Sequence, residues 1–314
     1  MKLSQLRTFV AIADHGGFAR AAARVGLTQS AASRQINALE YELGVPLFDR
    51  IGHRVRLTSE GEDLLRRSRR LLVDVDAIGE RARTLKTAQT GLLRVGATPQ
   101  VIENLLAKFL VQHRRAHPGV EVDLIEDGGA RLPTRLEQGD VHLAIMPTGY
   151  EHFQGRLLYP MHLLAALPAV HRLAKRAVLE IAELADEPLL LMSPGHASLT
   201  WFEAASRIAH IRPRVRLQSG SPHTLIELAK SGYGISVLPS PVRFPRDGVR
   251  TVPLVHRGAS IGTWAVAAWD GQRFLAPYAE QFIDELVASV KINYPGRELA
   301  RRAPPLPRPK PPGG

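Results

Sequence analysis

The sequence predicts an N-terminal all-α domain that carries a small hairpin, then a long linker helix, and then a C-terminal α/β domain with two lobes. Three observations predict this order: apolar residues at helical spacing in the first 57 residues, a seven-residue apolar repeat after residue 58, and alternating strand-like and helix-like segments after residue 91. The 314 residues also exceed the roughly 100–150 residues of one folding unit, so several domains are expected.

Composition excludes several classes of protein. With 45% apolar and 23% charged residues, the chain is neither a fibre nor wholly disordered. No window offers the roughly 18 uncharged apolar residues of a membrane span, and the first residues lack a signal-peptide pattern, so we expect the chain to stay in the cytoplasm. The absence of cysteine excludes disulfides, cysteine-ligated metals and a thiol nucleophile.

The excess of positive charge lies at the two ends of the chain. The net charge is +11; residues 1–90 hold 15 basic and 10 acidic residues, and residues 295–314 hold five and one. A polyanion is the usual partner of such a basic end, because each Lys or Arg that meets a phosphate releases condensed counterions. Solubility is the alternative reading, and charge alone leaves both open.

Residues 1–57 predict three short helices and a hairpin. Apolar stripes at residues 3–13 and 18–25 end at glycines, and Thr28 is suited to cap a third helix that runs to Gly44. After Pro46, residues 47–57 alternate around a turn that contains Gly52. The free face of the third helix carries small polar side chains, which suit a helix that enters the major groove of DNA. The predicted arrangement of helices and hairpin is a winged helix-turn-helix. The candidate DNA-binding residues on this helix are Gln29, Ser30, Ser33, Arg34 and Asn37, and on the wing Arg50, His53 and Arg54, followed by Arg56.

Residues 58–90 predict one long helix. Ser59 and Glu62 stand at capping-box spacing, and apolar residues then recur every seven positions. Such a repeat indicates a seam for a partner helix, and hence a homodimer. The alternative is that this helix packs on its own domain. The candidate dimerisation residues are Leu64, Leu71, Val75, Ile78, Ala82 and Leu85.

Residues 91–294 alternate strands and helices. Strands are expected at 92–97, 120–125, 141–146, 189–192, 215–218 and 235–238, and helices at 99–116, 130–138, from 198, 221–230 and 273–292. Two such groups, with extended segments 157–167 and 262–269 able to cross between them, predict two α/β lobes with a cleft. The last residues, 295–314, hold seven prolines and predict a disordered basic tail.

The N-terminal residues resemble those of the LysR-type transcriptional regulators. The likeness lies in Leu6-Arg7-Thr8-Phe9, Gly17 to Ala22, Thr28 to Ile36, Leu39-Glu40, Leu43-Gly44, Pro46 to Arg50 and Leu57-Thr58, in order and spacing over about sixty residues. A weaker likeness covers residues 91 to about 294, through Gly91 to Gly96, His117 to Val120 and Leu136 to Asp140.

This resemblance implies a sequence-specific DNA-binding regulator with a periplasmic-binding-protein-like effector domain. It implies base reading by Gln29, Ser30, Ser33 and Arg34, a homo-oligomer that is a dimer or a tetramer, and contact with RNA polymerase if the protein activates transcription. The family often has Arg where this chain has His53, so Arg54 is the substitute for the minor-groove contact. His142 stands where the family usually has Asp, and it has no assigned role.

The resemblance also implies a small effector between the lobes, and the local sequence favours an anion. Thr98-Pro99 and Ser221-Pro222 each place a hydroxyl before a proline at a helix start, where free amides attract a carboxylate. Simple capping is the alternative for each hydroxyl. The candidate effector-binding residues are Thr98, Pro99, Gln100, Gly128, Gly129, Met146, Thr148, Ser193, His196, Ser219 and Ser221.

An enzyme and a solute-binding transport protein are the two alternatives to a regulator. An enzyme would need a catalytic motif, and the chain has no phosphate loop with Lys-Ser or Lys-Thr and no His-Glu-x-x-His. His113 and His117 stand four apart, but with no nearby carboxylate we interpret them as surface residues, so no catalytic residue, metal site or cofactor is expected. A solute-binding transport protein is disfavoured because a helix-turn-helix is present and a signal peptide is not.

Overall fold

The computed structural model describes residues 1–51, 54–86 and 90–309, and it divides into two compact units. The first comprises residues 1–86 and 137–140, and the second comprises the described part of residues 87–136 and 141–314.

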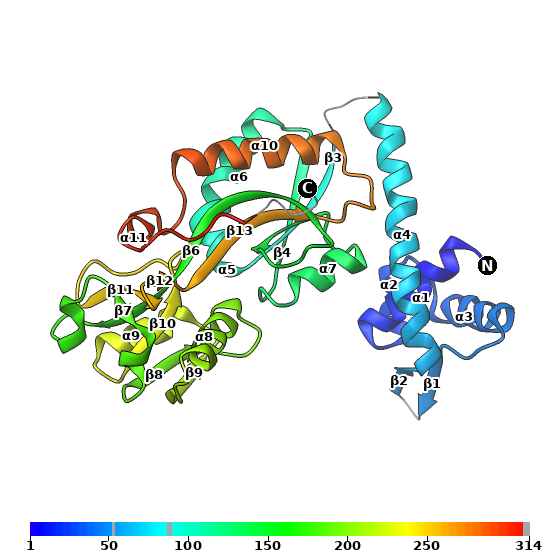
Figure 1. The fold of residues 1–314 in the computed structure, drawn as a ribbon. Coiled ribbons are helices and arrows are strands. Elements are labelled where there is room, and N and C mark those ends of the chain that lie inside the picture. The colour runs from blue at the N-terminus through cyan, green and yellow to red at the C-terminus, as the bar shows by residue number, and fades with distance from the viewer. Residues whose placement is uncertain (52–53, 87–89, 310–314) are drawn as a thin grey trace. The chain divides into compact units, whose positions relative to one another are not determined.

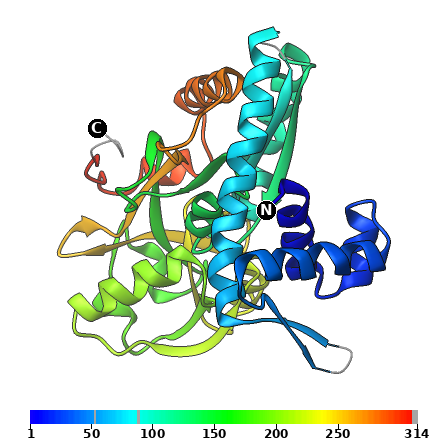
Figure 2. The ribbon, with the colours of Figure 1, turned by 90° about the vertical axis from the view of Figure 1, so that its right-hand side faces the viewer.

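The first unit holds three helices, a hairpin and a long helix (Figure 1). Their order is α1 (Leu3–His15), α2 (Phe18–Arg24), α3 (Gln29–Leu43), β1 (Phe48–Ile51), β2 (Arg54–Leu57) and α4 (Ser59–Lys86). The hairpin lies between the end of α3 and the start of α4 (Figure 2). The predicted three helices, hairpin and linker helix are therefore confirmed.

Local chemistry sets the ends of these helices. Gly16 and Gly44 follow α1 and α3 with φ of 65° and 74°, the left-handed conformation that glycine adopts without steric cost. Glu40 then accepts hydrogen bonds from the amides of Leu47 and Phe48, at 2.7 and 3.2 Å, and so ties the end of α3 to the hairpin. Phe9 meets Phe48 edge to face at 5.4 Å in the core of this unit.

The second unit begins with a mixed half-sheet, in which β3 pairs in parallel with β4 and β5, and β13 pairs antiparallel with β5 and β6. Its strands are β3 (Gly91–Ala97), β4 (Val120–Glu126), β5 (Leu143–Pro147), the long β6 (Gln154–Pro168) and β13 (Gly262–Trp269). Its helices are α5 (Pro99–Val101), a π-helical turn (Ile102–Leu106), α6 (Ala107–Ala116), α7 (Leu132–Gln138) and α10 (Pro277–Ile292). Alternation along β5 turns Leu143 and Ile145 toward α6 and α10, and Ala144 and Met146 toward α7, so helices cover both faces.

The second half-sheet is built in the same way. Its strands are β7 (Leu179–Glu180), β8 (Pro188–Met192), β9 (Arg214–Ser219), β10 (Ile235–Pro239), β11 (Val249–His256) and β12 (Ala259–Ser260). Its helices are two 3₁₀ turns (Arg172–Lys175 and Ile181–Leu184), α8 (Ala197–Ile208) and α9 (Pro222–Lys230). Leu189 and Leu191 pack toward α8, whereas Leu190 and Met192 pack toward α9.

Strand β6 joins the two half-sheets into two lobes. The strand order is β4-β3-β5-β13-β6-β10-β8-β9, and β6 pairs with β13 over residues 154–162 and with β10 over residues 163–166. We call the β4-β3-β5-β13 part with α6, α7 and α10 the first lobe, and the β10-β8-β9 part with α8 and α9 the second lobe. The predicted bilobal α/β fold is confirmed. Of the two expected crossing segments, 157–167 lies in β6, which pairs with strands of both lobes, whereas 262–269 is β13, which pairs with β5 and with residues 154–162 of β6.

Residues 295–309 differ from the predicted disorder. They form α11 (Arg297–Ala300) and then an extended segment that lies on β12 and β13. Ser260 donates to the carbonyl of Pro304 at 2.6 Å, the Trp264 indole donates to that of Pro307 at 3.1 Å, and Leu306 is buried. Proline-rich chain without periodicity can still order when neighbouring strands offer polar partners, and sequence composition does not report such partners.

Among the described helices, none has both the length and the apolar character that a membrane span requires.

Candidate DNA-binding surface and effector cavity

Helix α3 separates an apolar face from a polar one. Ala32, Ile36 and Leu39 are fully buried in the core of the first unit. The other side carries the residues predicted to bind DNA, of which Ser33 is half-buried and the rest are exposed: Gln29, Ser30, Arg34 and Asn37. The structure therefore brings all five to one accessible helix face.

Two polar contacts orient this helix. The Thr28 hydroxyl accepts a 3.2 Å hydrogen bond from the amide of Ala31 and so caps α3, as expected from the sequence. The Thr8 hydroxyl of α1 donates to the Gln35 side chain at 2.7 Å, and Thr8 is buried. No hydrogen bond or ion pair of the Arg34 guanidinium is found within the described residues. Arg34 is thus available to a partner outside the chain.

The wing residues are placed only in part. Arg50 and Arg54 stand on strands β1 and β2, where Arg50 pairs with Val55 and Arg54 with Ile51, but their side chains are outside the described structure. His53 lies entirely outside the described residues. Arg56 is exposed on β2.

Helix α4 has one apolar face against its own domain and another that is exposed. Leu65, Ser68 and Leu72 are buried against the core of the first unit. Among the predicted dimerisation residues, Leu71 is 41% and Ile78 70% exposed. Ala82 is also exposed, Leu64 and Val75 are half-buried, and the side chain of Leu85 is not described. One face of the helix therefore packs on its own domain, as the alternative drawn from the sequence expects, and the predicted seam is left accessible on another face.

A small cavity lies between the two lobes of the second unit. Its volume is about 80 Å³, and both lobes line it, mostly with apolar groups. The predicted residues that line it are Thr98, Gln100, Gly129, Met146 and His196. Other lining residues could not be predicted from the sequence, because they are apolar residues of strands, helices and loops where the pattern indicates the hydrophobic core. Among them are Met161, Met192, Trp201, Pro239 and Val242.

The remaining predicted residues lie around this cavity or in a second hollow. Pro99 and Ser221, together with Gln100, line the second hollow, of about 690 Å³. The Thr148 hydroxyl bonds that of Thr263 at 2.7 Å, and Ser219 Oγ accepts from the amide of Ser221 at 3.1 Å. None of the four residues Gly128, Thr148, Ser193 and Ser219 lines either space within the described structure.

Polar groups at the cavity are few and specific. Thr98 precedes α5 but its hydroxyl makes no capping hydrogen bond, in contrast to Ser221, whose Oγ accepts from the amide of Thr224 at 3.3 Å. His196 Nδ1 donates to the carbonyl of Ser193 at 3.0 Å, so Nε2 of the neutral imidazole is an acceptor. Ser198, at the start of α8, also lines the cavity and is buried.

The Gly128–Gly129 loop of the first lobe meets the second lobe, and its Gly129 lines the cavity. A Cβ on Gly128 would stand 3.3 Å from the carbonyl oxygen of Gly195 in the second lobe, and the Ala130 amide donates to that oxygen at 3.2 Å. The two lobes are therefore in direct contact through backbone at this edge, and a side chain at position 128 would require a shift of a few tenths of an ångström.

The interpretation of His113 and His117 as surface residues was wrong. His113 is 3% exposed, and Glu285 of α10 contacts both imidazoles. The error arose because Glu285 lies 172 and 168 positions further along the chain, where sequence spacing carries no signal. His142 has a structural contact: its Nδ1 accepts from the amide of Arg94 at 3.2 Å.

Comparisons with known proteins cover both units. The model of the bacterial regulatory helix-turn-helix protein, lysR family, matches residues 3–62, and that of the LysR substrate binding domain matches residues 86–291. The helix-turn-helix transcriptional regulator YnfL of Escherichia coli K12 is 30% identical over 305 residues, covering 93% of this chain and 99% of that protein. The regulator TtuA of Agrobacterium vitis is 31% identical, covering 92% and 98%.

Solved structures agree with these matches. A full-length variant of OxyR from Pseudomonas aeruginosa superposes with a TM-score of 0.72 at 25% identity, covering 95% of this chain and all of that one. Full-length CbnR complexed with its target DNA has the same fold, with a TM-score of 0.64 at 23% identity and coverage of 92% and 100%. The two matching family models and these relatives show that the chain belongs to the LysR family of bacterial helix-turn-helix transcriptional regulators, which are DNA-binding proteins with a C-terminal substrate-binding domain.

Proposed function

We propose that this regulator reads an operator with the start of α3 and that a small anionic effector, held between the lobes, changes its DNA binding or its activation of transcription. The observation that carries the DNA-reading part is the division of α3 into a buried apolar face and an exposed face of Gln29, Ser30, Arg34 and Asn37. A helix enters the major groove only when the face that meets the bases is unobstructed.

Base reading is assigned to the first turns of α3. Arg34 has the planar fork that pairs with O6 and N7 of guanine, and Gln29 can pair with adenine or hold a phosphate at the helix start. Ser30, Ser33 and Asn37 supply shorter donors and acceptors beside them. Arg50, Arg54 and His53 are proposed for the wing, in contact with phosphates or the minor groove.

Two copies of the chain are proposed to pair through α4. Ile78 is 70% and Leu71 41% exposed, and their heptad spacing suits a partner helix that would bury this apolar surface. Leu64 and Leu71 also border a mostly apolar hollow of about 190 Å³ beside Phe9 and Leu39. Leu64, Leu71, Val75, Ile78, Ala82 and Leu85 form the proposed seam, and pairs of dimers would give a tetramer.

The effector is proposed to carry a carboxylate. Thr98 offers a hydroxyl that its own helix does not use, and the amide of Gln100 lies in the first turn of the continuous helical segment 99–116, where the helix dipole is positive. The buried Ser198 offers a further hydroxyl donor, and the apolar walls would hold the carbon skeleton. His196 Nε2 is an acceptor, so it would meet a donor group of the effector and not the carboxylate. Pro99, Gly128, Gly129, Met146, Thr148, Ser193, Ser219 and Ser221 are proposed to shape the surrounding loops.

The effector would act by preferring one arrangement of the lobes. A ligand shifts such an equilibrium only by the difference between its affinities for the two states, commonly about 1–3 kcal/mol. The proposed outputs are a change in the spacing of the DNA-reading heads in the oligomer and, for an activator, contact with RNA polymerase.

DNA reading is tested by selection from a random duplex library with the full-length protein. Enrichment of one motif with two related half-sites supports the proposal, because a dimer presents two copies of α3. Recovery of unrelated sequences would contradict it, and so would DNA binding whose strength depends on the salt concentration but not on the DNA sequence.

Effector binding is tested by calorimetry with small carboxylates and with the matched amides. Binding of a carboxylate but not of its amide supports an anion site. Thr98→Val should weaken that binding, since it removes a hydroxyl of the cavity while keeping the side-chain shape. Thr134→Val, an exposed threonine of α7, is the matched control and should leave it unchanged. Equal binding of acid and amide would reject the anionic effector while leaving DNA reading intact.

A further inference from the structure

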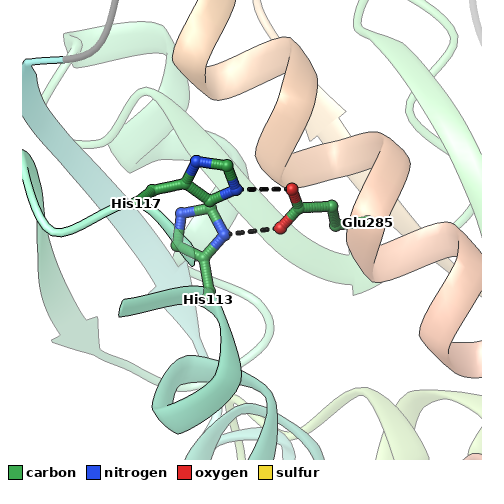
Figure 3. A group of neighbouring side chains, drawn as sticks. All are labelled: His113, His117 and Glu285. Atoms are coloured by element: carbon green, nitrogen blue, oxygen red, sulfur yellow. Dashed lines mark hydrogen bonds and ion pairs between the residues drawn. The ribbon is translucent and has the colours of Figure 1, made fainter. Parts of the chain in front are cut away.

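Three metal-ligating side chains meet in the first lobe, away from the cavity between the lobes. His113 comes from α6, His117 follows the end of that helix, and Glu285 comes from α10 (Figure 3). His113 Nδ1 lies 2.8 Å from one Glu285 oxygen and His117 Nε2 lies 2.6 Å from the other. The ligand atoms of all three residues lie within 4.8 Å of one another.

His113 is held by aromatic neighbours. Its ring stacks on Phe109 with centroids 5.6 Å apart and meets Phe282 edge to face at 4.9 Å. Its Nε2 is buried and has no hydrogen-bond partner among the described residues, so the only ring nitrogen that faces polar groups is Nδ1. A buried and packed imidazole of this kind is already oriented, which reduces the entropy lost when it binds a ligand.

Glu285 is present as a carboxylate at neutral pH. Burial alone would raise its pKa, but hydrogen bonds from His113 and His117 and their charges lower the pKa overall. The carboxylate is 34% exposed and the His117 side chain 20% exposed, whereas that of His113 is 1% exposed. An ion would therefore reach the site from the side of His117 and Glu285.

We propose that His113, His117 and Glu285 bind a divalent transition-metal ion such as Zn²⁺. Two imidazoles and one carboxylate with an open fourth position are a donor set that suits Zn²⁺, whereas Mg²⁺ and Ca²⁺ prefer oxygen ligands alone. Each neutral imidazole would bind the ion through the nitrogen that faces Glu285 and carry its single proton on the other ring nitrogen, Nε2 in His113 and Nδ1 in His117. With metal–ligand bonds of about 2.0–2.2 Å, the ligand atoms would stand roughly 3.3 Å apart, a small movement for the partly exposed Glu285.

The fourth position faces solvent and Gln281. The Gln281 amide nitrogen lies 3.4 Å from His117 Nε2 and 3.3 Å from a Glu285 oxygen, one turn before Glu285 on α10. Water or this side chain would complete a tetrahedron. Because the site clamps the end of α6 to α10 over one face of the sheet, bound metal would stabilise the first lobe.

The proposal stands apart from the effector proposal. His113, His117 and Glu285 line neither of the two spaces at the lobe boundary. Failure of carboxylate binding therefore leaves the metal site untouched, and the reverse also holds.

The test is calorimetric titration of tag-free, chelator-treated full-length protein with ZnCl₂. One Zn²⁺ per chain is expected, and Co²⁺ should show the visible absorption of a four-coordinate site. His117→Ala and Glu285→Gln should each weaken binding by at least about 100-fold, since each removes a ligand rather than an outer partner. Zn²⁺ should also raise the thermal unfolding midpoint of the wild-type protein and not that of these variants.

His171→Ala is the matched control. The His171 side chain is 25% exposed and lies 3.6 Å from Glu187, but it belongs to no group of three ligands in the part of the chain that the structure describes. This variant should bind Zn²⁺ as the wild type does. The proposal is overturned if the wild type shows no saturable binding, or if Glu285→Gln, which keeps a hydrogen-bonding group at the site, binds as tightly as the wild type.

Discussion

Asp127 accepts a 2.6 Å hydrogen bond from Nε of Arg135, and only 7% of its side chain is exposed. It also accepts from the amide of Gly128 at 2.7 Å. The carboxylate therefore anchors the Gly128–Gly129 loop, which borders the cavity, to helix α7. Burial by itself raises the pKa of Asp127, but the Arg135 and Gly128 hydrogen bonds, with the charges of Arg135 and Arg131, lower the pKa below the usual 3.8.

Replacing this carboxylate should destabilise the protein. We expect Asp127→Asn to lower the free energy of unfolding at pH 7 by roughly 1.5–3 kcal/mol, the usual worth of hydrogen bonds to a charged group. The lowered pKa means that the contribution is complete above the unfolded-state pKa and is lost as the pH falls through the folded-state pKa. Urea unfolding at several pH values measures this difference, which should shrink only below about pH 4. Arg131→Ala, at a 79% exposed partner, should change stability by less than about 0.5 kcal/mol.

His162 should make the free energy of unfolding depend on pH in a second range. It lies on β6 at the crossing between the lobes, is 2% exposed, and burial lowers its pKa from 6.5 to about 4. Ser260 donates its proton to Pro304, so His162 Nδ1 donates to Ser260 at 3.3 Å and the ring is neutral. Because the unfolded chain binds this proton first, stability should fall by about 3 kcal/mol between pH 6.5 and pH 4.

A pair of variants isolates this contribution. His162→Gln should remove the part of the pH dependence that lies between pH 6.5 and 4, as measured by denaturant unfolding. The exposed His15→Gln serves as control and should keep the wild-type slope. An unchanged slope in His162→Gln would show that other groups cause the acid sensitivity.

The two faces of α4 should respond differently to substitution. Ile78→Asp should weaken self-association, because it places a charge in the proposed seam, while the free energy of unfolding of the monomer stays nearly constant. Leu72→Ala should instead cost about 2–4 kcal/mol of stability, since Leu72 is 8% exposed in the core of the first unit. Sedimentation equilibrium and urea unfolding separate the two effects. Equal association of Ile78→Asp and the wild type would place the interface elsewhere.

Substitutions of Arg34 should show whether this residue reads a base or contacts a phosphate. Arg34→Ala should cost about 1–3 kcal/mol on the selected operator and relax discrimination at one base pair. Arg34→Lys keeps the charge but loses the bidentate fork, so it should lose discrimination while retaining binding to random DNA. Competition binding on operator variants at fixed salt measures both. Equal losses on operator and random duplexes would make Arg34 a phosphate contact.

The regulatory class could be predicted from the N-terminal residues, and the matching family models confirm it together with the expectation that the chain is a regulator rather than an enzyme. The sequence features that predicted the N-terminal helices are local. Thr28 and Gly44 set the two ends of α3 through contacts within a few residues. The cavity was less accessible to prediction. Thr98 and His196 follow the ends of strands and could be predicted as site residues, whereas Met161 and Trp201 lie within a strand and a helix, where an apolar residue indicates the hydrophobic core.

Local periodicity, capping residues and glycine positions were enough to predict the helices and hairpin of the first unit, the polar face of α3 and most strands and helices after residue 91, because each depends on side chains within one or two turns. They did not predict strand β11 (Val249–His256). Only the tertiary structure decided which distant groups meet. It brought Glu285 to His113 and His117, and it ordered Pro304 and Pro307 against β12 and β13. Contacts between segments far apart in the sequence depend on how sheets and helices pack, and spacing along the chain carries no record of that packing.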